Sequence, residues 1–236
     1  MNERDRPSFH RGRRPSFWLV YATMLRICTA AAMHDSRSAL LMHNSGQWHG
    51  CFIRLNHEGV EQERFPTSLL VQESNGLIQT RLTYCNSGQE RSMNFASVPH
   101  TMQVSADGCW SLGPGSITPF SWVAEVCVVK AEQRRRIVVR HGNSGIDQVV
   151  YVRETLAGPA TTEPDQLLHC VVEDQGDFTI WQPEPGVQLL LDARDRQTGD
   201  ATACGMRWLQ ADGSTAQIVR RYDSRGQLLP LDSTWP

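Results

Sequence analysis

Lysine is almost absent from this 236-residue chain: Lys130 is the only one, and the other 22 cationic side chains are arginine. So many guanidinium groups exceed the needs of any one site, and we interpret the bias as genomic base composition. The formal net charge of −2 argues against general nucleic-acid binding, which needs a broad basic face. No apolar run reaches the roughly 18–20 residues of a membrane-spanning helix. Composition therefore excludes disordered, collagen-like, coiled-coil and integral membrane proteins.

Paired cysteines are also lacking. The closest two of the seven cysteines are eighteen positions apart, so the chain has no C-x-x-C and no zinc-type cluster. An odd, scattered set of cysteines is typical of a reducing compartment, where buried thiols act as small hydrophobic side chains. We therefore expect a cytoplasmic protein with reduced, structural cysteines. The alternative is one nucleophilic or ligand-attaching cysteine.

Known catalytic and nucleotide-binding motifs are absent as well. The chain has no G-x-S-x-G, H-E-x-x-H, Walker loop or dinucleotide glycine fingerprint. Its eight histidines do not fall at ligand spacing on any one predicted strand. We name no catalytic residue, metal ligand or cofactor, and we favour a non-enzymatic role. The basic run Arg134-Arg135-Arg136 is interpreted as a solvated edge, with contact to an anionic partner as the alternative.

The first 32 residues differ from the rest of the chain. A basic stretch with two prolines leads into an apolar run that Arg26 interrupts, which spoils the outline of a secretory signal. We interpret residues 1–32 as an N-terminal extension. It is the product of a start site assigned too early, a disordered tail or, as the last alternative, a true secretory signal. Residues 33–236 are then expected to form a single domain.

From residue 46 onward, apolar and polar residues alternate with a period of two, and turn signals recur at short intervals. Asn75-Gly76 favours a tight hairpin turn. Residues 35–43 predict a short helix capped by Asp35 or Ser36, and a second short helix is expected at 164–171. The pattern predicts an all-β protein, either a sandwich or an antiparallel up-and-down barrel of about 8–10 strands. The sequential hairpins favour the barrel.

Gly46-Gln47-Trp48 stands where the predicted helix leads into the first strand, as the G-x-W motif does in lipocalins. Glycine allows a tight turn there, and the indole closes the narrow end of the barrel. In that fold an arginine from a late strand covers the indole face by a cation–π contact. Arg220 and Arg221 are the matching candidates, so Gly46, Trp48, Arg220 and Arg221 are expected to be structural.

The chain resembles an uncharacterised cyanobacterial family of lipocalin-like proteins in the calycin superfamily. The resemblance covers about residues 39–230, begins close to Met33, and implies a barrel fold without an established activity. The matching segments are His43-Asn44-Ser45-Gly46-Gln47-Trp48-His49-Gly50, Pro119-Phe120-Ser121, Val150-Tyr151-Val152-Arg153-Glu154 and Ile218-Val219-Arg220-Arg221-Tyr222-Asp223.

Two charged residues lie among apolar residues on the strongest predicted strands. Glu125 shares a strand face with Val123 and Cys127, and Arg153 shares a face with Tyr151. If both faces point inward, Glu125 and Arg153 would line a cavity as an ion pair. If both point outward, they are ordinary solvated charges. We name Trp48, Phe52, Glu125, Tyr151 and Arg153 as candidate ligand-binding residues.

The predicted barrel leads to three functional hypotheses. The first is binding of a small hydrophobic or amphipathic ligand, such as a pigment, tetrapyrrole or lipid, because barrels of this size enclose ligand-sized interiors. The second is an enzyme resembling the lipocalin-like bilin lyases that act on phycobiliproteins. The third is an interaction module with a side-chain-filled interior. A homodimer is compatible with each of them.

Overall fold

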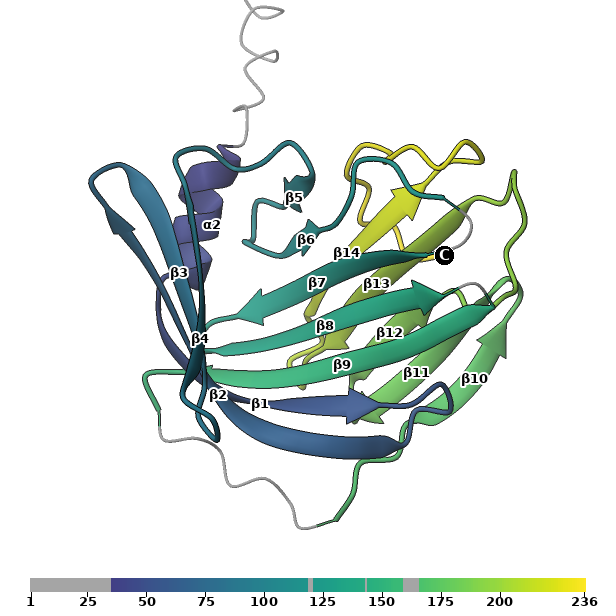
Figure 1. The fold of residues 1–236 in the computed structure, drawn as a ribbon, viewed down its shortest axis with the longest axis horizontal. Helices are drawn as coiled ribbons and strands as arrows, with labels where there is room; N and C mark the ends of the chain where they lie inside the picture. The colour runs from purple at the N-terminus through teal and green to yellow at the C-terminus, as the bar shows by residue number, and fades with distance from the viewer. Residues whose placement is uncertain (1–34, 119–120, 143, 159–165) are drawn as a thin grey trace, which may run out of the picture. The chain divides into compact units, whose positions relative to one another are not determined.

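The computed structural model describes residues 35–118, 121–142, 144–158 and 166–236, all of which belong to the unit His34–Pro236 (Figure 1). The expected extension 1–32 lies outside the described residues. One helix and fourteen strands are described, and their bounds are α2 Ser36–Asn44, β1 Gly46–Leu55, β2 Glu61–Ser74, β3 Leu77–Tyr84, β4 Gln89–Phe95, β5 Met102–Val104, β6 Trp110–Leu112, β7 Trp122–Lys130, β8 Gln133–Gly142, β9 Gly145–Leu156, β10 Val171–Gln175, β11 Phe178–Glu184, β12 Val187–Leu191, β13 Thr202–Leu209 and β14 Thr215–Tyr222.

The helix α2 forms as its sequence predicts. Asp35 is the N-cap, and its carboxylate accepts a hydrogen bond from the backbone N–H of Arg37 at 3.1 Å. The chain then turns directly into β1 at Gly46, whose φ of 122° is one that residues with a side chain rarely adopt. This conformation confirms the expected tight turn at the G-x-W motif.

A curled nine-stranded antiparallel sheet is built from two meanders, β1–β4 and β5–β9 (Figure 1). The meanders join where β9 pairs with β1, which gives the order β4-β3-β2-β1-β9-β8-β7-β6-β5. Asn75 and Gly76 connect β2 to β3, as predicted. The strands β4 and β5 lie at the two ends of the sheet, so hydrogen bonding between strands does not close it.

A third meander, β10–β14, forms a separate five-stranded sheet in sequential order. Its strands β13 and β14 pack against β7. Buried side chains from both sheets form one core, with Ile137, Val149 and Tyr151 from the larger sheet and Leu189 and Met206 from the smaller. Burial of apolar area of this kind is the main stabilising contribution to such a fold.

The all-β, antiparallel prediction and the short helix before the first strand are therefore confirmed. The described residues form fourteen strands in two sheets, however, rather than one barrel of about eight to ten. The helix expected at 164–171 is not formed in the part that is described, where residues 166–170 are irregular and β10 begins at Val171. Every residue of β10 is exposed, so it lacks the apolar alternation that would have identified it as a strand. No helix among the described residues is long and apolar enough to span a membrane.

Trp48 is completely buried, and its Nε1 donates to the backbone carbonyl of Asn44 at 2.8 Å. The arginine that covers its ring is Arg134 on β8, with Cζ 4.2 Å from the ring centroid, and not Arg220 or Arg221. Only β9 separates β8 from β1, whereas β14 belongs to the other sheet. Arg220 instead donates to the carbonyl oxygens of Thr101 and Pro114 and lies over Tyr222.

Replacement of Trp48 by alanine should lower the free energy of unfolding by about 3–5 kcal/mol, because a fully buried indole leaves a cavity and its N–H partner unpaired. Trp235→Ala is the control, since that side chain is half-buried near the C-terminus. It should cost about 1 kcal/mol or less. Equal losses in urea denaturation would contradict the role assigned to Trp48.

Candidate functional site

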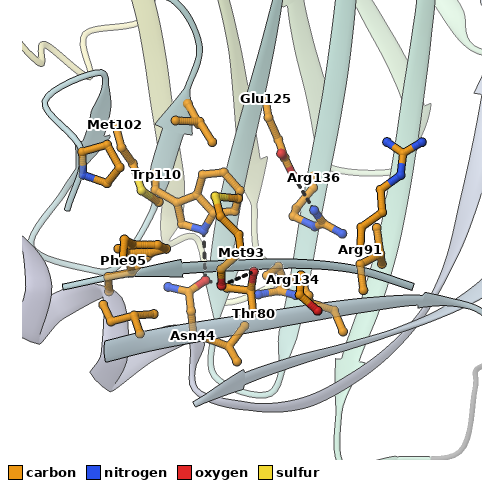
Figure 2. A pocket seen from close by; sticks show the side chains of 18 residues that line it. Asn44, Thr80, Arg91, Met93, Phe95, Met102, Trp110, Glu125, Arg134 and Arg136 are labelled. Carbon is orange, nitrogen blue, oxygen red and sulfur yellow. Dashed lines mark hydrogen bonds and ion pairs between the residues drawn. The ribbon is translucent and has the colours of Figure 1, made fainter. Parts of the chain in front are cut away.

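A cavity of about 330 Å³ lies on the concave side of the curled nine-stranded sheet, between β2–β4 and β6–β8, with α2 along one side (Figure 2). Most of its wall is apolar. The apolar lining residues are Leu40, Leu69, Val71, Ile78, Leu82, Met93, Phe95, Pro99, Met102, Trp110 and Leu112.

Strand alternation explains how the sequence builds this wall. On β3, Ile78, Thr80 and Leu82 line the cavity, and Arg81 between them is exposed. The edge strand β4 forms the rim. Its residues 89–94 are exposed, and Met93 keeps 49% of its surface accessible although it lines the cavity. One wall of the cavity is thus an edge strand, which is hydrogen-bonded to β3 alone.

The base of the cavity holds a charged cluster, called here the arginine–glutamate cluster. It is formed by the buried residues Arg134, Arg136 and Glu154 and the half-buried Glu125. The Glu154 carboxylate accepts from Arg134 Nε at 2.7 Å and from Arg136 Nε and Nη2 at 2.8 Å each. Glu125 accepts from Arg136 Nη1. Arg134 and Glu154 are each 1% exposed. Two guanidinium groups therefore share one fully buried carboxylate.

A glycine makes room for this carboxylate. Gly50 on β1 is directly opposite Glu154 on β9, and a Cβ at Gly50 would lie 2.5 Å from Glu154 Cγ and 2.4 Å from the Arg153 carbonyl oxygen. Any side chain at Gly50 would displace the glutamate or the neighbouring strand.

The charges of the cluster are stabilised by one another. Burial alone would raise the pKa of Glu154, but Arg134 and Arg136 outweigh it and hold this pKa at about 2. Burial opposes the charged form of Arg136, whereas Glu154 and Glu125 raise its pKa above the ordinary value. Glu154 and Arg136 are therefore ionised at neutral pH, and removal of either leaves an uncompensated buried charge.

Asn44, at the end of α2, links the helix to this cluster. Its side-chain oxygen accepts from Trp110 Nε1 at 3.1 Å and from Arg134 Nη1 at 3.4 Å, and its amide nitrogen donates to the Gly108 carbonyl at 3.0 Å. Together with the Trp48 bond to its backbone carbonyl, these contacts fix the helix end against β1, β6 and β8.

Of the predicted site residues, Glu125 lines the cavity, but it pairs with Arg136 rather than with Arg153. Arg153 lies 3.4 Å from Glu184 on β11, on the face of the sheet that packs against the smaller sheet, and Tyr151 shares that face. Successive side chains of a strand point to opposite faces of the sheet. Arg153 and Tyr151 are at odd-numbered positions of β9 and Glu154 is at an even-numbered one, so Glu154 faces the cavity and the other two face away from it.

The other two predicted residues lie next to the cavity rather than in its wall. Trp48 packs beneath Arg134, as described above. Phe52 lies under Arg136, with the guanidinium carbon 5.4 Å from its ring centroid, and belongs to a separate cluster with Phe65 and Tyr84.

The sequence interpretation missed Arg134, Arg136, Glu154 and Asn44. The sequence predicts a solvated edge at Arg134-Arg135-Arg136, and this prediction is wrong for Arg134 and Arg136, which are both buried. Glu154 and Asn44 belong to segments on which the family resemblance was based, and Asn44 directly precedes the Ser-Gly-x-Trp turn. Glu154 shares one predicted strand face with the apolar residues Val150 and Val152. A charged residue on such a face was the signal in the sequence that pointed to a buried charge.

Glu154→Gln should destabilise the protein at pH 7 by about 3 kcal/mol, the equivalent of a pKa lowered from 4.5 to about 2. A lowered pKa stabilises the fold above pH 4.5, and this stabilisation is lost as the pH falls to about 2. The wild type should therefore lose more stability than Glu154→Gln over that range in urea titrations. Glu63→Gln, at an exposed ion pair with Arg54, is the control and should change stability by less than about 1 kcal/mol.

Double-mutant cycles distinguish the observed ion pairs from the predicted one. Glu125→Gln and Arg136→Met should couple by about 1 kcal/mol or more, because their side chains are in direct contact. Glu125→Gln and Arg153→Met should be additive within about 0.5 kcal/mol, since the two side chains lie on opposite faces of the sheet. Strong coupling in the second cycle would contradict the observed register.

Comparisons with known proteins place the chain in a family. No curated protein matches it. A crystal structure of a protein with unknown function from the DUF3598 family of Nostoc punctiforme has a similar fold, with a TM-score of 0.66 and 18% sequence identity over 84% of this chain and 97% of that one. Residues 33–159 match the model of the domain of unknown function DUF3598, N-terminal. The chain therefore belongs to the DUF3598 family.

Proposed function

We propose that this protein binds one small amphipathic ligand in the cavity of the curled sheet. The observation that carries the proposal is a cavity of about 330 Å³ with apolar walls and an ordered, buried charged cluster at its base. Ligand sites are typically concave, about 300–1,000 Å³ in volume and mostly apolar, with a few fixed polar groups that orient the ligand.

The lining has an apolar and a polar side. Figure 2 shows Phe95, Met102 and Trp110 on one side of the cavity and Arg91, Glu125 and Arg136 on the other. An apolar chain would be buried against the first group, and a polar head would lie toward the second. An unsegregated apolar cavity would favour a wholly apolar ligand instead.

The size of the cavity separates the earlier hypotheses. A side-chain-filled interaction module would leave no such space. The volume lies at the low end of the range for ligand sites, which suits a single-chain lipid better than a bulky tetrapyrrole. The bilin-lyase alternative and the pigment hypothesis are therefore less well supported than lipid binding.

We further propose that the curled sheet is a lipocalin-like barrel opened between β4 and β5. A short helix leading into Gly46-Gln47-Trp48 and an arginine stacked on that indole support this proposal. A cytoplasmic location is supported by the cysteines. Among the described residues, Cys109, Cys127, Cys170 and Cys204 are buried free thiols, and burial raises the pKa of Cys109, Cys170 and Cys204 to about 12.

Filling the cavity tests the function. Thr80 lines it, so Thr80→Trp should occupy much of the space and weaken binding of dodecanol or dodecanoic acid at least about tenfold. Gln79→Trp is the matched control, because its side chain bonds Gln72 away from the cavity. Native mass spectrometry and titration of tryptophan fluorescence measure both. No binding of either probe by the wild type, or equal binding by both variants, would refute the proposal.

A further inference from the structure

One buried cationic nitrogen at the cavity base is without a partner among the described residues. Arg134 Nε donates to Glu154 and Nη1 to Asn44, but Nη2 donates to no acceptor and is shielded from solvent. The whole side chain is 1% exposed, and it belongs to the cavity lining. Leaving a buried charged donor unsatisfied is costly, so an acceptor bound in the cavity would stabilise this arrangement.

The cavity also carries an excess of one positive charge. Arg91, Arg134 and Arg136 line it, and two carboxylates, Glu125 and Glu154, balance two of the three cations. Arg91 forms no ion pair within the described ranges. It is exposed at the rim on β4, with Cζ 5.7 Å from the Tyr84 ring centroid. A ligand with one negative charge would bring the site to neutrality.

We propose that the natural ligand is a single-chain monocarboxylate of the fatty-acid class, which deepens the proposed function and rests on it. Its carboxylate accepts from Arg134 Nη2 after a small side-chain movement that uncovers this buried nitrogen, and Arg91 supplies the balancing charge from the rim. Its apolar chain lies along the side formed by Phe95, Met102 and Trp110. Charge-assisted bonds from guanidinium to carboxylate are about twice as strong as neutral hydrogen bonds, so the head group determines selectivity.

The charge of the head group distinguishes this ligand from others with the same chain. A neutral alcohol leaves the excess cation uncompensated. An alkyl phosphate near its second ionisation carries more negative charge than the site can balance, and it meets Glu125 and Glu154 as like charges. The order of affinity expected at pH 7.5 is therefore carboxylate, then alcohol and phosphate.

The test compares dodecanoic acid, dodecanol and dodecyl phosphate by isothermal titration calorimetry on the full chain. The acid should bind about tenfold more tightly than the alcohol. Arg91→Gln should weaken the acid about threefold or more and leave the alcohol unchanged. Arg81→Gln is the matched control on the same hairpin, because Arg81 is exposed and outside the cavity lining. It should bind all three probes as the wild type does.

Carbon-13 NMR of carboxyl-labelled dodecanoic acid tests the head-group contact without altering the buried cluster. The pKa of the bound carboxyl should lie below that of the free acid, because the neighbouring guanidinium groups favour its ionised form. Equal affinity for acid and alcohol, tighter binding of the phosphate, or a bound pKa that is unchanged or raised would overturn the monocarboxylate. Each of these results would leave cavity binding intact. Failure of every probe to bind would instead overturn the proposed function.

Discussion

The structure depends on one buried carboxylate shared by two arginines. Glu154 lies on β9, the strand that joins the two meanders of the larger sheet, and both of its partners are on β8. These charges tolerate burial because each guanidinium donates directly to the Glu154 carboxylate. Arg134 extends the arrangement to Trp48 by stacking and to Asn44 by a hydrogen bond. The end of the helix, the G-x-W turn and the base of the cavity are thus held by one polar network.

Three consecutive arginines on β8 point alternately into the cavity and toward the smaller sheet. Arg134 and Arg136 face the cavity, whereas Arg135 faces the smaller sheet, where it pairs with Glu184 and lies 4.4 Å from the Trp208 ring centroid. The strand is buried on both faces, so neither set is solvated. One strand therefore contributes both to the cavity and to the packing between the sheets.

Local signals in the sequence were sufficient for the short helix before the first strand, the Asn75-Gly76 turn and the all-β class, because each depends on neighbouring residues. The site depends on distant ones. On β9, Arg153 shares one face with Val149 and Tyr151, and Glu154 shares the other face with Val150 and Val152. Both faces therefore carry a charged residue among apolar ones, and alternation alone did not reveal which of the two charges faces the cavity. Only the register with β8 decides that Glu154 meets Arg134. For the same reason Glu125 was found, but its partner was misassigned.

The cations at the base of the cavity are arginines, and the shape of the guanidinium group matters there. Arg136 donates to Glu154 from Nε and Nη2 and to Glu125 from Nη1, while its plane lies over Phe52. A lysine ammonium is a point charge without a plane, so it would not bridge two carboxylates and cover an aromatic ring in this geometry. Arg134 contacts Glu154, Asn44 and Trp48 in the same way, and its Nη2 has no acceptor among the described residues. A planar, multidentate cation thus allows one side chain at the base of the cavity to contact a carboxylate, an amide and an indole at once.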